Sequence, residues 1–163
     1  IISWSVSATG RAQGQPVVIK WRRGGYYSKG VWTEVAVEVP SLPSDFGLQV
    51  GLAGDQPTNA AYPLVTGDST FDEIFDGWTD HGDLTPVLLS GDVRRGLLAL
   101  RNSPGLELSA LNGQYTHEQR ALVRISIGET CLDPSKIDAL TTSAVAFAET
   151  AARTFGATHA RAT

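Results

Sequence analysis

The sequence has very little cysteine. Its 163 residues include one, Cys131, so no disulfide can form within the chain and a cysteine-based metal cluster is excluded. A single cysteine between a predicted strand and a predicted helix is typical of a buried, inert thiol. The less favoured interpretation is a nucleophile activated by His81 or His117.

The sequence also lacks an excess of basic residues and a long hydrophobic run. It has 13 Lys and Arg against 17 Asp and Glu, a net charge of −4. Affinity for phosphate backbones comes from clustered basic residues, so we expect no nucleic acid partner. No apolar run approaches the roughly 18 residues of a membrane span. The sequence starts with Ile1 rather than Met, and we expect it to be the ordered part of a longer protein with a further N-terminal segment.

Glycine-rich nucleotide motifs are missing as well. The glycines at positions 24, 25, 47, 51 and 54 are not followed by the helix, lysine or third glycine of a P-loop or a dinucleotide fingerprint. We therefore interpret them as turn glycines and expect no cofactor.

What is present is a strand-rich first half. Alternating apolar residues predict strands over residues 1–8, 17–23 and 31–39, followed by a short strand over 47–52. The first two form a hairpin, with a turn opening at Thr9-Gly10 and with Ile2, Trp4 and Val6 facing inward. Residues 70–78 alternate in the same way and predict another strand, with Asp72 and Asp76 on one face.

Helical periods follow. Asp83 is predicted to cap a short helix over 84–89, and Ser90 to cap a second helix over 92–101. The pair Asn112-Gly113 predicts a tight hairpin between strands at 106–111 and 114–120, with a further strand at 122–127.

The longest predicted helix begins after Asp133 and ends before Gly156. Its predicted buried stripe is Ile137, Leu140, Ala144, Phe147, Ala148, Ala151 and Phe155. The fold class is therefore α+β: antiparallel meanders with a central helical pair and a long C-terminal helix packed on the sheet. We expect one domain over residues 1–155 and a frayed tail over 156–163.

Three segments resemble a known family: TGDSTFDEIF at 66–75, LLSGDVRRGLLAL at 88–100 and PGLELSALNGQYT at 104–116. With these TGDxxFD and LL(S/T)xxxRxxLLxL motifs, residues 15–155 are similar to an uncharacterised bacterial α+β domain. The matching residues are Thr66, Gly67, Asp68, Phe71, Asp72, Leu88, Leu89, Ser90, Arg94, Leu97, Leu98, Leu100, Pro104, Gly105, Glu107 and Leu108. The chain departs from the family at 78–83, where the basic VRGDD reads WTDHGD. The resemblance implies a preceding membrane-spanning stretch, membrane association and a place at the cytoplasmic face of a bacterial membrane; it implies no catalytic residues.

Two groups of side chains are candidate sites. The first is acidic and contains one imidazole: Asp72, Asp76, Asp80, His81 and Asp83. It suggests a hard-metal or acid/base site, although its spacing is not that of an EF-hand and capping roles explain it more simply. The second interleaves basic and aromatic residues in one loop: Arg22, Arg23, Tyr26, Tyr27 and Lys29. Such a loop suits an acidic partner, a stacked base or anionic headgroups.

We interpret the chain as a non-enzymatic binding or scaffolding module that meets a protein partner through its exposed loops or its sheet edge. One alternative is a metal-dependent or acid/base enzyme that uses the acidic group. The other is a small-ligand or lipid-binding module with a pocket between the sheet and the last helix, lined by Phe147, Trp4 or Trp21.

Overall fold

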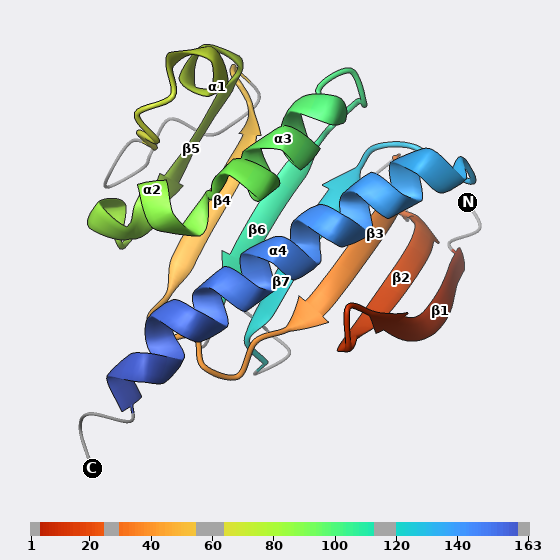
Figure 1. Cartoon of the computed structure of the whole chain (residues 1–163). Helices are drawn as coiled ribbons and strands as arrows, with labels where there is room; N and C mark the ends of the chain where they lie inside the picture. Colours follow the sequence, from red (N-terminus) through yellow and green to blue (C-terminus); the bar gives the residue numbers. More distant parts are fainter. Residues whose placement is uncertain (1–3, 25–29, 55–63, 113–119, 160–163) are drawn as a thin grey trace.

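The computed structural model describes residues 4–24, 30–54, 64–112 and 120–159 (Figure 1). In chain order the elements are β1 (Trp4–Ala12), β2 (Gln15–Arg23), β3 (Val31–Glu38), β4 (Gly47–Leu52), α1 (Ser69–Ile74), β5 (Phe75–Thr79), the 3-10 turn η1 (Gly82–Leu84), α2 (Thr85–Leu88), α3 (Gly91–Ala99), β6 (Glu107–Leu111), β7 (Leu122–Ile127) and α4 (Pro134–His159). The α+β class is confirmed.

The strands form one seven-stranded antiparallel sheet in the order β1-β2-β3-β7-β6-β4-β5. Strands β1 to β3 are neighbours in chain order, as a meander requires. The other half of the sheet is not a meander, because β6 lies between β7 and β4. The sheet therefore has two edges, β1 at one end and β5 at the other.

A tight turn makes the β1–β2 hairpin. Gln13 and Gly14 have φ of 51° and 81°, and positive φ at both central residues is the type I′ geometry that fits the twist of two strands. The predicted turn at Thr9-Gly10 is wrong, because β1 runs through both residues and pairs with β2 over all nine of its positions.

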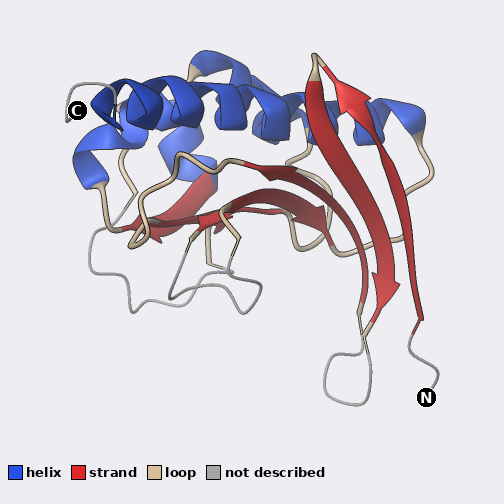
Figure 2. Ribbon diagram, turned by 90° about the horizontal axis from the view of Figure 1, so that it is seen from below, coloured by secondary structure: helices blue, strands red, loops and turns tan. Residues whose placement is uncertain are grey.

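All the helices lie on one face of the sheet (Figures 1 and 2). Helix α4 crosses β3 and β7, and α3 lies beside it over the other half. As predicted, Asp133 starts α4: its Oδ1 accepts hydrogen bonds from the Ser135 backbone N–H at 2.9 Å and from the Ser135 hydroxyl at 2.7 Å. These bonds satisfy a backbone donor that the first turn leaves unpaired.

The core lies between the helices and the sheet. The predicted stripe of α4 is buried in it except for Ile137, which is half-buried. On β3 the residues that face the helices, Thr33, Val35 and Val37, are all buried. Burying such aliphatic surface at roughly 25 cal/mol per Å² is what attaches the helices to the sheet.

The predicted strand over 70–78 is wrong in its first half, where the structure has helix α1. Asp68 caps this helix, because its carboxylate accepts a hydrogen bond from the Phe71 N–H at 3.2 Å. The helix places Phe71 against Phe75, with ring centroids 4.5 Å apart. The cap and this aromatic contact outweigh the alternating pattern, and the strand begins only at Phe75.

Three further predictions about element ends need correction. Asp83 lies inside η1 and does not cap α2, whose N-cap is Leu84; Ser90 precedes α3 as predicted but makes no capping hydrogen bond through its side chain. Gly156 does not end α4, because its φ is not positive and the helix continues to His159. Strand β6 pairs with β4 on one side and with β7 on the other. The partner strand predicted over 114–120 lies, except for Arg120, outside the described residues. The Gly113 half of the predicted turn lies outside the described residues.

Of the three residues predicted to face inward on the first strand, Ile2 lies outside the described residues, and the prediction is wrong for Trp4 and Val6. Trp4 is 38% exposed and Val6 57% exposed. Their register does place them on the face that bears the helices, opposite Arg23 and Trp21. The helix layer covers little of β1, however, because α4 packs on β3 and β7. Strand β1 alternates in sequence but is exposed on both faces, because the helices hardly cover it.

Candidate functional site

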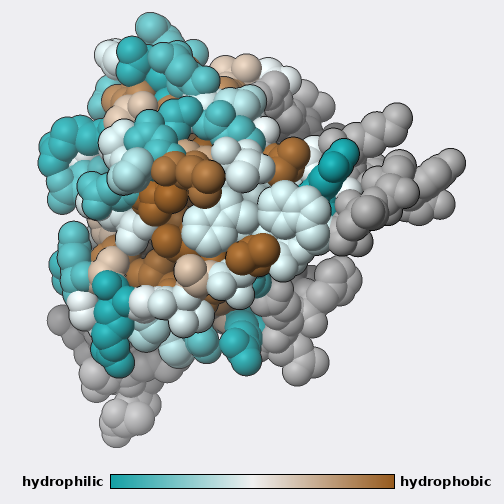
Figure 3. All heavy atoms as spheres, turned by 90° about the vertical axis from the view of Figure 1, so that its right-hand side faces the viewer, coloured by the Kyte–Doolittle hydropathy of each residue, from teal (hydrophilic) through white to brown (hydrophobic). Residues whose placement is uncertain are grey.

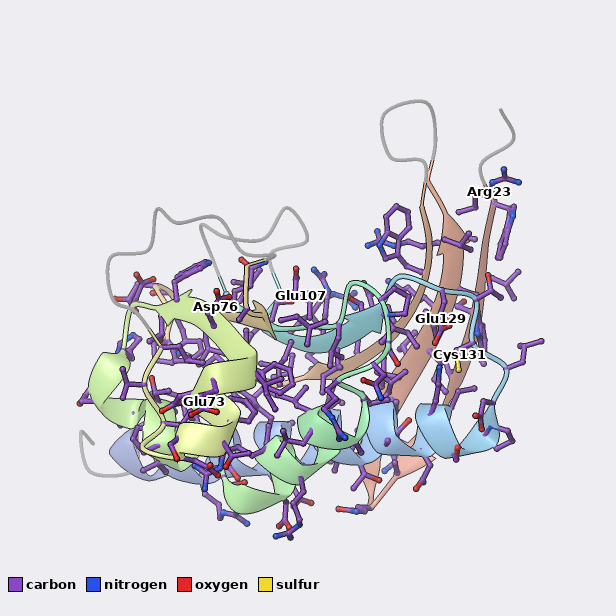
Figure 4. All side chains as sticks on the ribbon, turned by 90° about the horizontal axis from the view of Figure 1, so that it is seen from above. Arg23, Glu73, Asp76, Glu107, Glu129 and Cys131 are labelled. Atoms are coloured by element: carbon purple, nitrogen blue, oxygen red, sulfur yellow. The ribbon has the colours of Figure 1, made fainter. Side chains whose placement is uncertain are left out.

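The basic and aromatic loop is only partly within the described chain. Tyr26, Tyr27 and Lys29 lie outside the described residues. Arg22 is near the end of β2, where a guanidinium nitrogen lies 3.7 Å from a Glu34 carboxylate oxygen and its guanidinium carbon lies 5.6 Å from the centre of the Trp32 ring. Arg23 ends the strand and is exposed (Figure 4). The side chain of Arg22 therefore already contacts Glu34 and Trp32. Arg23, at the end of β2, is exposed and can contact a partner.

Glu34 belongs to a small ionic group on the helix-free face. Its buried carboxylate also lies 3.9 Å from Arg124 on the neighbouring strand β7. Two cations beside one carboxylate keep that charge paired within the sheet. The charges of this group face one another within the sheet, so the group offers little to a ligand.

The acidic group does not converge on one point. Asp72 in α1 accepts hydrogen bonds from the Thr66 backbone at 3.1 Å, the Thr66 hydroxyl at 2.6 Å and the Gly67 backbone at 3.2 Å. Asp76 in β5 accepts one from the Gly54 N–H at 3.0 Å, and its second oxygen is buried without a hydrogen-bond partner among the described residues. Asp83 is exposed on η1. Asp72 and Asp76 therefore hold neighbouring loop segments in place.

His81 is a structural residue in the described chain. Its ring stacks on Phe46 at a centroid distance of 5.2 Å, with Phe155 of α4 on its edge at 6.3 Å. Across the described residues there is no group of three or more His, Cys, Asp or Glu that could hold a metal ion. The metal-dependent alternative thus has no cluster to support it among those residues.

Cys131 is buried, as expected of an inert thiol. It lies in the segment that joins β7 to α4, and the sheet holds this segment at two points. The Trp21 indole N–H donates to the Cys131 carbonyl at 2.8 Å, and the Cys131 N–H donates to the Thr33 hydroxyl at 2.8 Å. That hydroxyl in turn donates to the Glu129 carbonyl at 2.7 Å.

The same segment is attached to the start of α4. The Lys136 ammonium lies 2.6 Å from a Glu129 carboxylate oxygen. This hydrogen bond to Glu129 raises the pKa of Lys136 above its usual 10.5. The β7–α4 segment is therefore held on both sides, which fixes the position of its exposed residues.

One exposed apolar hollow results, a feature that periodicity alone did not reveal. It measures about 320 Å³ and is lined by Trp4, Val6, Trp21, Thr130 and Leu132. Leu132, on the fixed segment, is 76% exposed. Figure 3 looks onto this end of the molecule and shows hydrophobic residues gathered there. We call these five residues the apolar hollow. The sequence signal that could have found it is Leu132, an apolar residue immediately before a helix cap.

The strand beside the hollow has a free edge. Because a type I′ turn closes the hairpin, Ala12 and Gln15 form a hydrogen-bonded pair, and so does every second pair along the ladder. The N–H and C=O groups of Ser5, Ser7, Thr9 and Arg11 therefore point away from β2. Among the residues the structure describes, no strand or loop lies against that side of β1.

The ligand pocket predicted between the sheet and α4 is not formed by the residues named for it. Phe147 is fully buried in the core, whereas Trp4 and Trp21 line the hollow at the sheet end. A second hollow, of about 510 Å³, lies between α3 and α4 on the outer side of the helix layer; its charged lining residues are Asp92, Arg95, Asp138 and Glu149.

Compared with models of known protein families, with curated proteins and with solved structures, the chain shows no significant match. The resemblance to a bacterial domain therefore stays a prediction. No helix in the described part of the chain has the length and hydropathy that a membrane span requires.

Proposed function

We propose that this domain is a non-enzymatic module that binds another polypeptide along β1. The supporting observation is that two features of a protein-binding surface lie together: the free edge of β1 and the apolar hollow next to it. An exposed strand edge binds a partner strand through main-chain hydrogen bonds, and an adjacent pocket for side chains adds selectivity.

The rest of the hairpin fits this role. Arg23 lies opposite Trp4 in the β1–β2 register, at the same end as the hollow. An exposed cation beside an apolar centre matches the usual anatomy of interfaces, in which a polar rim surrounds a desolvated core.

The hollow itself suits a side chain of a partner. The only polar side-chain groups in its described lining are the Thr130 hydroxyl and the indole N–H groups of Trp4 and Trp21, and the Trp21 N–H already donates to the Cys131 carbonyl. A pocket for a polar metabolite needs several converging polar groups. An aliphatic or aromatic residue of a bound strand needs none.

The test is site-specific photo-crosslinking in the cells that produce the protein. A photoreactive amino acid replaces Ser7, which is exposed on the free edge; the matched control replaces Glu73, which is exposed on α1 at the far end of the sheet (Figure 4). We expect a protein adduct from position 7 and none from position 73. Absence of an adduct at position 7, or equal adducts at both positions, would overturn the proposal.

A small apolar ligand is a second candidate, because about 320 Å³ lies within the range of ligand pockets. Titration with dodecanoate, followed by calorimetry, separates the two. Heat that disappears in the variant Val6→Glu would favour the ligand. A protein adduct at position 7 without any dodecanoate heat would favour the polypeptide.

A further inference from the structure

We infer that the polypeptide bound along β1 is a second copy of this chain, related to the first by a two-fold axis. The two β1 strands would pair antiparallel, joining the seven strands of each copy into one continuous sheet. This inference rests on the proposed function and names its partner. It draws on the charge, the shape and the size of the β1 edge.

The charge of β1 permits self-pairing. Strand β1 has no acidic residue and one basic residue, Arg11, near the hairpin turn. The Arg11 guanidinium donates to the Gly14 carbonyl at 3.0 Å, so it is turned toward the hairpin turn. When the two-fold axis passes near Val6 or Ser7, the two Arg11 side chains lie at opposite ends of the new ladder. No like charges then face each other across it.

The nearest other cations are far enough apart. Lys20, Arg22 and Arg23 lie on β2, one strand in from the edge. Between the β2 strands of the two copies there are three strand spacings of about 4.8 Å, which is about 14 Å. That separation exceeds the Debye length of about 8 Å at physiological salt, so their repulsion is largely screened.

The apolar hollow is self-complementary under the same symmetry. In a continuous antiparallel sheet with a perpendicular two-fold axis, side chains keep their face in both copies. Trp4 and Val6 lie on the helix-bearing face in each copy. An axis near Val6 therefore brings the two hollows side by side. Each copy would then cover part of the apolar hollow of the other.

The free edge also lacks the usual protection against self-pairing. Exposed edges are commonly protected by Lys, Pro, a bulge or short length. Strand β1 has nine residues, WSVSATGRA, paired with β2 in unbroken register. It contains neither Lys nor Pro, and it has no bulge. An axis that pairs the two edges closes the assembly at two copies, because each β1 is then used.

The size of the surface predicts a weak dimer. A stable interface buries about 800 Å² on each partner. One nine-residue strand edge and one small hollow give less contact than the 20–30 residues typical of such an interface. We therefore expect a dimer that forms in the micromolar range and dissociates on dilution.

The experiment is sedimentation equilibrium of the 163-residue chain over a wide concentration range. The variant Ser7→Pro removes an outward N–H while leaving the β1–β2 hydrogen bonds in place. We expect it to raise the dissociation constant about tenfold or more, since each copy loses one ladder bond at the axis. Gly10→Ala is the matched control on the same strand. Its N–H points to β2 and its new methyl group meets nothing within 4 Å, so we expect an unchanged dimer.

A charge pair makes the result independent of any folding defect in the proline variant. We expect Ser7→Lys alone and Ser7→Glu alone to dissociate more readily, by roughly fivefold, because like charges would lie close across the axis. Mixed in equal amounts, the two variants should restore association. Failure of the mixture to associate while the unmodified chain dimerises would overturn self-pairing through β1.

The photo-crosslink distinguishes this inference from the proposed function. An adduct of twice the mass of the chain supports a second copy. A monomer at every concentration, together with an adduct of any other mass, overturns self-pairing and leaves the binding function standing. Absence of any adduct at position 7 overturns both.

Discussion

The two edges of the sheet are built in opposite ways. Strand β5 has five residues, and its Gly77 carbonyl accepts a hydrogen bond from the Leu64 N–H at 3.2 Å. Helix α1 stacks Phe71 on its first residue. Strand β1 has nine residues, most of them exposed, and no described segment hydrogen-bonds to its outer side. One edge is closed by its own chain, and the other is open.

This difference shows where the molecule can form new contacts. A closed edge contributes to the stability of the monomer, because its apolar side chains and backbone groups are already paired. An open edge contributes little to the stability of the monomer. Its outward N–H and C=O groups can form strand hydrogen bonds only with a partner. The predictions below test the comparison by making the same kind of change at both ends, starting with the largest expected effect.

The first prediction compares an aromatic residue at each edge. Phe71→Ala should destabilise the protein by about 3–5 kcal/mol, because the side chain is fully buried and its loss leaves a cavity against Phe75. Trp4→Ala should cost less than half as much, since that side chain already meets water. Urea unfolding measures both. Equal losses would mean that the two edges are not built differently.

The second prediction compares a glycine at each edge. A Cβ added to Gly77 would lie 2.0 Å from the Gln49 carbonyl oxygen, a backbone atom that cannot move without parting β4 from β5. We expect Gly77→Ala to cost about 3 kcal/mol, as overpacking does. Gly10→Ala meets no atom within 4 Å and should be near neutral. Thermal unfolding is sufficient, and a tolerated Gly77→Ala would contradict the closed-edge description.

The third prediction tests the hydrogen bonds that hold Leu132 in place. Thr33→Val keeps the side-chain shape but removes the hydroxyl that joins Cys131 to Glu129. Two backbone groups lose a partner, one of them on buried Cys131, and we expect a loss of about 2 kcal/mol and faster hydrogen exchange at the Cys131 amide. Thr150→Val is the control. Its hydroxyl donates to the Ala146 carbonyl, which the helical N–H already satisfies, and accepts from Arg153, which is exposed and can turn to water instead. Unchanged exchange in Thr33→Val would show that other contacts fix the segment.

The smallest effect concerns the start of α4, next to the open edge. Hydrogen bonds from the Ser135 hydroxyl and backbone lower the pKa of Asp133 below 3.8. A lowered folded-state pKa means that the stabilisation is present above the unfolded pKa and is lost as pH falls through the folded pKa. Asp133→Ala should therefore lower the urea midpoint at neutral pH and match the unmodified chain at pH well below 3.8. A deficit that persists in acid would assign the effect to something other than the carboxylate.

Much of the fold was predictable from local pattern. The strands at 17–23, 47–52 and 122–127 and the helix after Asp133 were placed correctly, because apolar period and capping residues act over a few positions. Residues 70–74 were wrongly predicted as strand, because the same local pattern was the basis of that prediction. Their alternation is real, but the Asp68 cap and the contact between Phe71 and Phe75 favour a helix.

The candidate sites were less predictable. The acidic residues are close in sequence, but Asp72 and Asp76 bind different loop segments, and closeness in sequence could not reveal this. The apolar hollow combines β1 and β2 with the segment before α4, which lies more than 100 positions further along the chain. No spacing rule connects residues so distant.

The sequence by itself determined which residues alternate, where the chain turns into helix and which residues start α4. Those outcomes depend on dihedral preferences and on neighbours within one or two turns. Only the tertiary structure decided that β3 would be buried and β1 exposed, although both alternate, and that one sheet edge would be closed and the other left open. Burial depends on what lies opposite a surface, and in this molecule the helix layer ends before it covers β1.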